Sequence, residues 1–137
     1  MLRYLFDTDH LTLFENGNPS VARRLALQPA RSVGISVVTI EETLRGRLVQ
    51  LARAADCPAR IYHYNFLEQT LIDVTHFPVV PFDQVAESNF QQLRFIRIGT
   101  QDRKIASIAL SSQLILVTAN RRDFARVPGL VLEDWAV

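Results

Sequence analysis

Short apolar runs separated by longer mixed stretches form the most regular pattern in this chain. Runs that are rich in β-branched or large apolar residues and end at polar or turn residues predict five β-strands: Tyr4–Phe6, Val33–Val38, Pro78–Pro81, Leu114–Val117 and Leu130–Leu132. Continuous apolar runs are typical of strands buried on both faces of a sheet. We therefore expect a sheet that is covered on both sides.

The stretches between these runs predict helices: Pro19–Leu27, Thr39–Ala55, Ala59–Val74, Asp83–Ile96 and Asp102–Ser112. Thr39 and Glu42 have the spacing of a capping box, with Thr39 as the N-cap, and Asp83 is a second candidate N-cap. Alternating strands and helices indicate an α/β fold with a mostly parallel sheet.

Composition is that of one globular domain spanning residues 1–137, with 48% hydrophobic and 21% charged residues and no linker long enough to divide it. Fifteen basic residues oppose 14 acidic ones, which excludes a histone-like polycation and an acidic disordered tail. Lys104 is the only lysine, so arginine supplies nearly all the positive charge. Arginine favours phosphate contacts, although a GC-rich genome gives the same bias.

Cys57 is the only cysteine, so the chain forms neither an internal disulfide nor a paired-cysteine metal site. We expect a buried thiol there. No apolar run approaches the roughly 18–20 residues that a membrane span needs, and Asp7 comes too early for a signal peptide. The sequence therefore predicts a soluble protein of the cytoplasm that has no contact with a membrane.

Acidic side chains occur repeatedly where a predicted strand ends. This group comprises Asp7, Asp9, Glu41, Glu42, Asp83 and Asp123, with Asn120 beside the last and Asp102 at the start of the helix before the fourth strand. In an open α/β sheet, ligands bind at the carboxyl ends of the strands. We therefore expect acids from distant sequence positions to meet in one crevice.

Carboxylates that lie close together repel one another, and a divalent cation relieves that repulsion. Their hard oxygen atoms suit Mg²⁺ or Mn²⁺, which would also bind a phosphodiester and activate water. The chemistry indicated is metal-dependent phosphoryl transfer to water. Each acid also has a structural alternative, because Asp7 or Asp9 is suited to cap a helix and Asp102 suits a first helical turn.

Four sequence blocks occur in order along the chain: LFDTD at residues 5–9, SVVTIEETLRG at 36–46, IGTQD followed by IA at 98–106, and LVTANRRDF with a later EDW at 116–135. Together they resemble the motifs of PIN domains, and most closely those of VapC-type toxin ribonucleases from bacterial toxin–antitoxin pairs. The resemblance extends over nearly the whole chain. It places the acid of the second block on Glu42 and not on Glu41.

The resemblance implies a three-layer α/β/α fold with about five mostly parallel strands and an Mg²⁺- or Mn²⁺-dependent endoribonuclease. It makes Asp7, Glu42 and Asp102 the acidic triad. Asp7 and Asp102 would be the main metal ligands, and Glu42 would act by ligation or by orienting the attacking water. Asn120 stands at a fourth position that is Asp in many members, which bears on a second metal. Asp123 either compensates for that change or is a surface acid.

For substrate binding, the residues of interest are the hydroxyls of Thr8 and Thr118 and the guanidinium groups of Arg45, Arg121 and Arg122. The resemblance also implies an RNA substrate, a homodimer, and a cognate VapB-like antitoxin whose C-terminal segment covers the active site. His10 is expected to be a packed or surface imidazole. Tyr62, Tyr64 and Phe66 are expected in the core or in a dimer face.

Two alternatives remain at this point. Asn120 at the fourth acidic position favours a catalytically degenerate PIN module that binds RNA or a partner protein. Asp7-Thr8-Asp9 after an apolar strand also fits a HAD-type phosphatase with Asp7 as the nucleophile. The chain is short for that second family, and Lys104 is its only lysine.

Overall fold

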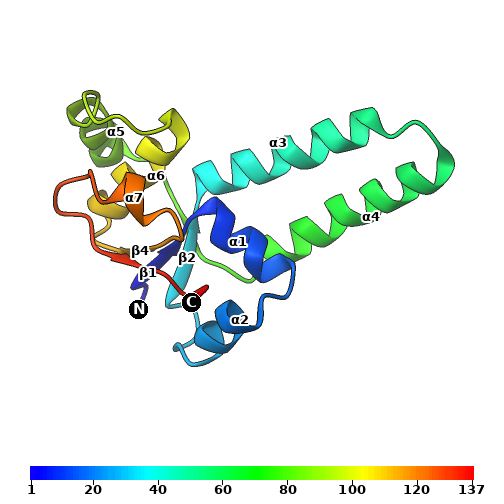
Figure 1. The fold of residues 1–137 in the computed structure, drawn as a ribbon, viewed down its shortest axis with the longest axis horizontal. Helices are drawn as coiled ribbons and strands as arrows, with labels where there is room; N and C mark the ends of the chain where they lie inside the picture. Colours follow the sequence, from blue (N-terminus) through cyan, green and yellow to red (C-terminus); the bar gives the residue numbers. More distant parts are fainter.

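The sheet has the predicted five strands, all of them parallel. A computed structural model describes all 137 residues. The strand order is β3-β2-β1-β4-β5, and Figure 1 labels β1, β2 and β4. Their bounds are Tyr4–Phe6 for β1, Val33–Ser36 for β2, Val79–Val80 for β3, Ile115–Val117 for β4 and Leu132–Glu133 for β5. Because β1 lies between β2 and β4, the strand order reverses beside it, at the place where α/β sheets bind ligands.

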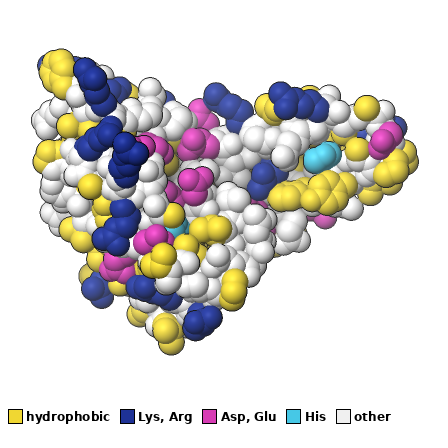
Figure 2. Space-filling model, viewed as in Figure 1, with side chains coloured by type: hydrophobic (Ala, Val, Ile, Leu, Met, Phe, Trp, Pro, Cys, Tyr) yellow, Lys and Arg dark blue, Asp and Glu magenta, His cyan; other side chains and the backbone are white.

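Two long helices form an arm that projects from the body of the molecule (Figure 1). They are α3, Val37–Arg53, and α4, Cys57–Val74. Tyr62 and Tyr64 on this arm are 59% and 60% exposed, so the alternative that places them in the core is wrong. Figure 2 shows apolar side chains on the surface of the arm.

Arg47 links the base of the arm to the body of the molecule through side-chain contacts. Its guanidinium lies 3.1 Å from Glu15 Oε1 and donates to Thr70 Oγ1 at 3.0 Å. It also stacks 4.1 Å from the centre of the Phe66 ring. Since Arg47 and Glu15 are both largely buried, loss of either one would leave an unpaired charge in a poorly solvated place.

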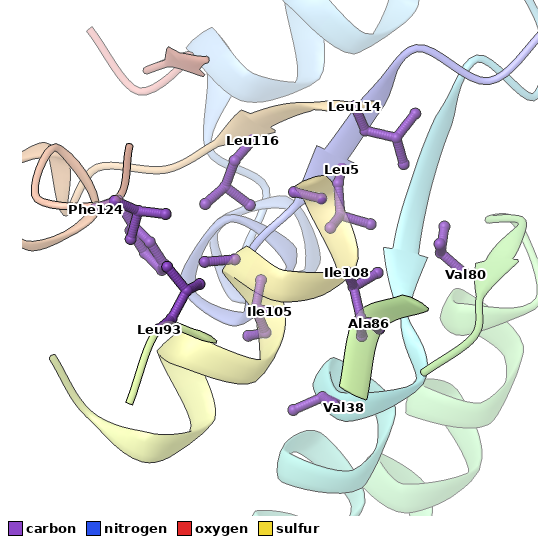
Figure 3. Packing of buried hydrophobic residues seen from close by; sticks show 13 residues of the cluster. Leu5, Val38, Val80, Ala86, Leu93, Ile105, Ile108, Leu114, Leu116 and Phe124 are labelled. Carbon is purple, nitrogen blue, oxygen red and sulfur yellow. The ribbon is translucent and has the colours of Figure 1, made fainter. Parts of the chain in front are cut away.

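Strand residues alternate between two hydrophobic cores, one on each face of the sheet. In β1, Leu5 belongs to one core and Phe6 to the other. Helices α5, α6 and α7 cover the core around Leu5, at Gln84–Gln92, Thr100–Ser111 and Arg121–Phe124 (Figure 3). Helices α1 and α2 contribute to the core around Phe6, at Thr8–Glu15 and Pro19–Ala26. The fold is therefore the expected three-layer α/β/α arrangement.

Local structure corrects several predicted boundaries. Strand β2 ends at Ser36, whose Oγ accepts a hydrogen bond from the Thr39 N–H at 3.0 Å. Ser36 is thus the N-cap of α3, and the capping box expected at Thr39 is wrong. Asp83 is confirmed as an N-cap, because its Oδ1 accepts from the Ala86 N–H at 2.9 Å. Helices α1 and α7 have no counterpart among the predicted elements.

Cys57 is exposed at the start of α4, so the expectation of a buried thiol is also wrong. The helix begins after the N-cap Asp56, with Pro58 accommodated in its first turn, where a missing N–H costs nothing. The side chain of Cys57 consequently faces water. No helix of the structure combines the length and the apolar surface needed to cross a bilayer.

Gly34 in β2 provides a test of how tightly the sheet is packed. A Cβ atom there would lie 3.0 Å from both the Pro78 carbonyl oxygen and Leu2 Cδ1. That carbonyl belongs to the backbone and accepts from the Ile35 N–H, so it cannot easily shift. We predict that Gly34→Ala lowers the free energy of unfolding by about 1–3 kcal/mol.

Gly46→Ala is the matched control. Gly46 lies within α3 with open space around its Cα, so alanine there should raise stability by about 0.5–1 kcal/mol through helix propensity alone. Urea denaturation of both variants measures the two effects. Equal responses would contradict the close packing between β2 and β3.

Candidate active site

The carboxyl edge of the sheet brings together several of the residues predicted from the sequence, whereas Asp83 caps α5 and Glu41 pairs with Arg45. Asp7 follows β1 directly, and Asn120 follows β4 by three residues. Glu42 lies in the second turn of α3, which begins where β2 ends, and Asp102 lies in the first turn of α6. Figure 2 shows acidic side chains gathered where the body meets the start of the arm.

Asp7 is only 4% exposed and has a structural task as well as a place in the site. It is the N-cap of α1, and its Oδ1 accepts from the His10 N–H at 2.8 Å. Its own N–H donates to the Val117 carbonyl at the end of β4. The backbone of Asp7 is thus fixed on both sides, so the carboxylate has a defined position at the edge of the sheet.

A chain of hydroxyl groups holds Glu42. Thr8 Oγ1 donates to Glu42 Oε1 at 2.6 Å, and Thr39 Oγ1 lies 3.1 Å from Thr8 Oγ1. Ser36 Oγ donates to Thr39 Oγ1 at 3.3 Å. Because the Thr8 hydrogen points at the carboxylate, the Thr39 hydrogen must point at Thr8, and such one-directional chains strengthen each bond.

Thr8 was expected to position water or phosphate, and the structure instead gives its hydroxyl to Glu42. Ser36 and Thr39 are fully buried and were not expected to support the site. Both residues lie at the start of the same helix as Glu42, where hydroxyl side chains serve as caps. This position is the feature of the sequence that could have identified them. The supporting hydroxyls therefore come from α1 and from both ends of the β2–α3 junction.

The pKa of Asp102 indicates that the acids lie close to one another. Partial burial raises the pKa of Asp102 to about 6, and the negative charges of Glu42, Asp7, Asp9 and Asp123 add to the effect, in that order. Asp9 has a raised pKa too, through partial burial and the charge of Asp7, opposed by His10. The site thus concentrates negative charge in a poorly solvated crevice.

The donor set at this edge suits a hard divalent cation, because it consists of carboxylate oxygens that destabilise one another in its absence. The acids are neighbours without forming a closed group of three metal ligands. The chemistry of the donors and their mutual repulsion therefore make this edge of the sheet a candidate cation site.

Asn120 and Asp123 form a pair at the start of α7. Asn120 Nδ2 donates to Asp123 Oδ2 at 3.1 Å, and the Asn120 N–H donates to Thr118 Oγ1 at 2.9 Å. Thr118 is fully buried, so the expectation that its hydroxyl contacts substrate is not supported. Its bond to Asn120 instead shapes the turn after β4. Asp123 is close enough to raise the pKa of Asp102.

Comparison with known proteins decides the family. A model of the PIN domain matches residues 4–130. The chain belongs to the PIN domain family. Among curated relatives, a protein of Shigella flexneri named tRNA(fMet)-specific endonuclease VapC is 33% identical across 99% of this chain and 100% of its own length. Its counterpart from Salmonella typhimurium is 28% identical across 98% and 99%.

Solved structures agree with this assignment to the VapC type. DNA-bound VapBC from Salmonella typhimurium superposes with a TM-score of 0.79 at 26% identity, covering 98% of this chain and 99% of that one. A toxin–antitoxin complex from Klebsiella pneumoniae gives a TM-score of 0.71 at 25% identity, covering 93% and 95%. The alternative of a HAD-type phosphatase is therefore wrong.

Two sets of arginines flank the acids of this PIN domain. Arg45 is exposed, and its Nη2 donates to Glu41 Oε2 at 2.8 Å. Arg121 and Arg122 are exposed on α7 and form no ion pair. A cleft of about 480 Å³ extends along α3 from Glu42 past Arg45 to Arg53, with Gln101 on its other wall. Basic groups thus lie on both sides of the acidic crevice.

The raised pKa of Asp102 predicts a pH dependence for the cation-free PIN domain. Its pKa is about 6 when folded against 3.8 ordinarily, so the folded state binds the proton more tightly. Stability should therefore fall as pH rises from about 4 to about 6. Asp102→Asn should remove this part of the slope and stabilise the protein at pH 7 by about 1 kcal/mol, a figure discounted because the side chain is half exposed.

Urea denaturation in the presence of a chelator, at pH 4.5 and pH 7, measures this effect. Asp9 and Glu15 also have raised pKa values, so the difference between the wild type and the variant isolates Asp102. A variant that is equally stabilised at both pH values would contradict the assigned cause.

Proposed function

We propose that this PIN domain, acting as one unit over residues 1–137, is a divalent-cation-dependent endoribonuclease and the toxin of a VapBC-type toxin–antitoxin pair. The observation that carries the proposal is the convergence of Asp7, Glu42 and Asp102, because partial burial and then the charges of Glu42 and Asp7, among others, raise the pKa of Asp102 to about 6. The relatives named as VapC endonucleases support the reaction class.

Asp7 and Asp102 would be the main ligands of the cation, and Glu42 would complete the site by ligation or by orienting the attacking water. We take the cation to be Mg²⁺ or Mn²⁺ because all the donors are carboxylate oxygens. When bound, the cation supplies positive charge that stabilises the developing charge on the phosphate and eases deprotonation of water. The Asn120–Asp123 pair provides one further carboxylate at the α7 side of the site.

In this proposal Glu42 takes the proton of the attacking water. Thr8 occupies Oε1, which leaves Oε2 to accept that proton. The water oxygen forms a bond to phosphorus, and the bond from phosphorus to the 3′ oxygen breaks. The leaving 3′ oxygen takes up a proton from solvent water, so the products are a 5′-phosphate and a 3′-hydroxyl end.

The flanking arginines would hold the RNA backbone on either side of the scissile phosphate. Arg121 and Arg122 have no acidic partner to displace, whereas Arg45 must share its charge with Glu41. The cleft along α3 gives a single strand a path from Glu42 toward Arg53. Phosphate contacts of this kind fix position and not sequence.

For partners, we propose a VapB-like antitoxin and a second copy of the chain. Relatives were solved as VapBC complexes, which supports the antitoxin. The arm bears exposed apolar residues that include Leu48, Ile61, Tyr62, Tyr64, Leu71 and Ile72. Such surfaces on soluble proteins commonly mark protein contacts. A protein with this function acts in the cytoplasm, where its RNA substrate is found.

The activity can be tested with purified protein, a mixed tRNA and mRNA substrate, and Mg²⁺ or Mn²⁺. We predict cation-dependent cleavage that a chelator abolishes, and losses of about 100-fold or more in Asp7→Asn and Asp102→Asn, because each removes a charge from the cation site. Glu68→Gln, which neutralises an exposed acid on the arm, is the control and should cleave as the wild type does.

Cells expressing the wild-type chain should stop growing, and cells expressing Asp7→Asn should not. A wild type that cleaves no RNA with either cation would contradict the nuclease and favour the degenerate module suggested by Asn120. Cleavage that survives in both site variants would contradict the assigned residues.

The hydroxyl chain behind Glu42 gives a finer test. Thr8→Val removes the donor to Glu42 Oε1 while keeping the side-chain shape, and we predict about a tenfold fall in kcat, the usual effect of losing a supporting hydrogen bond. Thr8→Ser keeps the hydroxyl and should restore most of the rate. Thr12→Val on the same helix is the control, since its hydroxyl bonds only to the Thr8 carbonyl. Equal rates in Thr8→Val and Thr12→Val would contradict the role of Thr8.

A further inference from the structure

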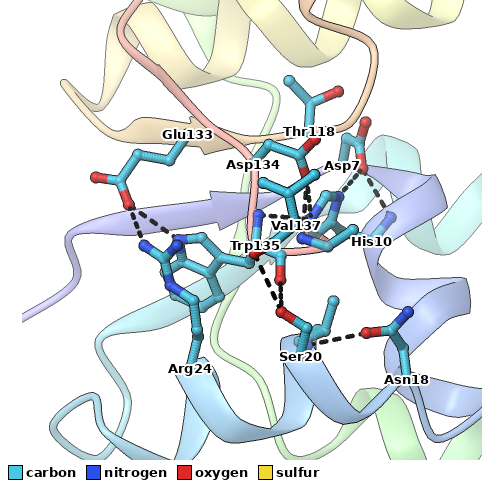
Figure 4. A network of polar contacts seen from close by, with 12 residues as sticks. Asp7, His10, Asn18, Ser20, Arg24, Thr118, Glu133, Asp134, Trp135 and Val137 are labelled. Carbon is cyan, nitrogen blue, oxygen red and sulfur yellow. Dashed lines mark hydrogen bonds and ion pairs between the residues drawn. The ribbon is translucent and has the colours of Figure 1, made fainter.

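His10 lies fully buried between Asp7 and the segment Glu133–Val137 (Figure 4). Several contacts anchor that segment. The fully buried Trp135 packs edge-on against Tyr4 and Phe6, at 5.0 and 5.4 Å between ring centres. Ser20 Oγ donates to the Trp135 carbonyl at 2.8 Å. The backbone around Trp135 is therefore a fixed reference point beside the site.

This anchored backbone determines which nitrogen of His10 carries the proton. The Trp135 N–H donates to His10 Nε2 at 3.3 Å, so Nε2 must present its lone pair. In a neutral imidazole the hydrogen then resides on Nδ1. Asp134 Oδ1 also lies 3.6 Å from Nε2, but it accepts from the Ala136 N–H within its own turn.

Nδ1 of His10 is buried without a hydrogen-bond partner, and it lies 3.5 Å from Asp7 Oδ1. This distance exceeds that of a formed hydrogen bond. An unpartnered buried donor is costly, and the carboxylate is the acceptor that faces it. Hydrogen bonds in active sites are often long until the site is loaded.

The backbone N–H and the ring Nδ1 of His10 both face the same carboxylate oxygen of Asp7. The backbone N–H already donates to Oδ1 at 2.8 Å, and Nδ1 faces Oδ1 as well. Oδ2 is then the oxygen left for the acidic crevice. We propose that His10 is a positioning residue that couples the anchored segment Glu133–Val137 to Asp7 and so presents Oδ2 to the cation. This inference rests on the proposed function.

Two substitutions of His10 distinguish the roles of its two ring nitrogens. Asparagine places an amide near the position of Nδ1 and keeps a donor toward Asp7, whereas glutamine places its amide near Nε2 and loses that donor. We expect His10→Gln to bind Mn²⁺ about tenfold more weakly in calorimetry, with a matching fall in RNA cleavage. His10→Asn should recover most of the affinity. His63→Gln, the same change on the arm, should match the wild type.

A second measurement needs no variant and no cation. The ¹⁵N chemical shifts of His10 in the cation-free protein at pH 8 report its tautomer, and the hydrogen should be on Nδ1. A hydrogen on Nε2 overturns the inference, even if His10→Gln fails to fold. Equal Mn²⁺ affinity in folded His10→Gln and wild type also overturns it, as does equal weakening in His10→Gln and His10→Asn, because imidazole packing would then be the cause.

These outcomes are distinct from failure of the proposed function. A wild type that neither binds Mn²⁺ nor cleaves RNA contradicts the nuclease, whatever the tautomer of His10. A wild type that does both, alongside a His10→Gln variant that equals it, contradicts only the role of His10.

Discussion

Repulsion between carboxylates is the constraint on which the rest of this structure depends. Parallel strands bring the ends of β1, β2 and β4 to one edge, and each contributes an acid there or in the helix that follows. Bringing such charges together in a half-buried crevice lowers stability unless a cation offsets it, as the raised pKa of Asp102 shows. The hydrophobic cores on the two faces of the sheet must supply the stability that this edge opposes.

Asp7 and Glu42 depend on groups that also have a structural task. Asp7 is the N-cap of α1, and Glu42 accepts from Thr8 in the first turn of α1, at the end of a hydroxyl chain that runs back to Ser36, the N-cap of α3. Helix starts are suited to this double use because their free N–H groups and positive dipole ends favour negative charge. The sequence leaves open whether Asp7 caps a helix or belongs to the site. In the structure Asp7 is both a helix cap and a member of the acidic cluster.

Much of the fold follows from local sequence pattern. The buried strands, the parallel sheet and the Asp83 cap are all visible in short segments, and the motif blocks place Asp7, Glu42 and Asp102 at one edge. Helix α1 is not predicted because it has few apolar positions and because its first residues belong to an acidic motif. Val37 and Val38 favour a strand by propensity, but the cap at Ser36 and the burial of Val38 place them in a helix.

Contacts between distant segments are beyond such reasoning. Nothing near His10 in the sequence indicates that Trp135 will bond to its ring, and nothing near Tyr62 indicates that α4 lies on a projecting arm. The exposed Cys57 has the same origin, because burial depends on which helix a segment packs against. The burial of Thr118, directly after β4, likewise depends on contacts with distant segments.

The double duty of Asp7 has a genetic consequence. A single nucleotide change converts an aspartate codon to an asparagine codon, and asparagine caps helices as well as aspartate does. The chain can therefore lose the charge on which the proposed activity depends while α1 and the fold around it persist. An inactivated copy of this kind would keep its surface and would still bind any partner that recognises the shape of the protein. A single mutation that abolishes the activity therefore need not free that partner.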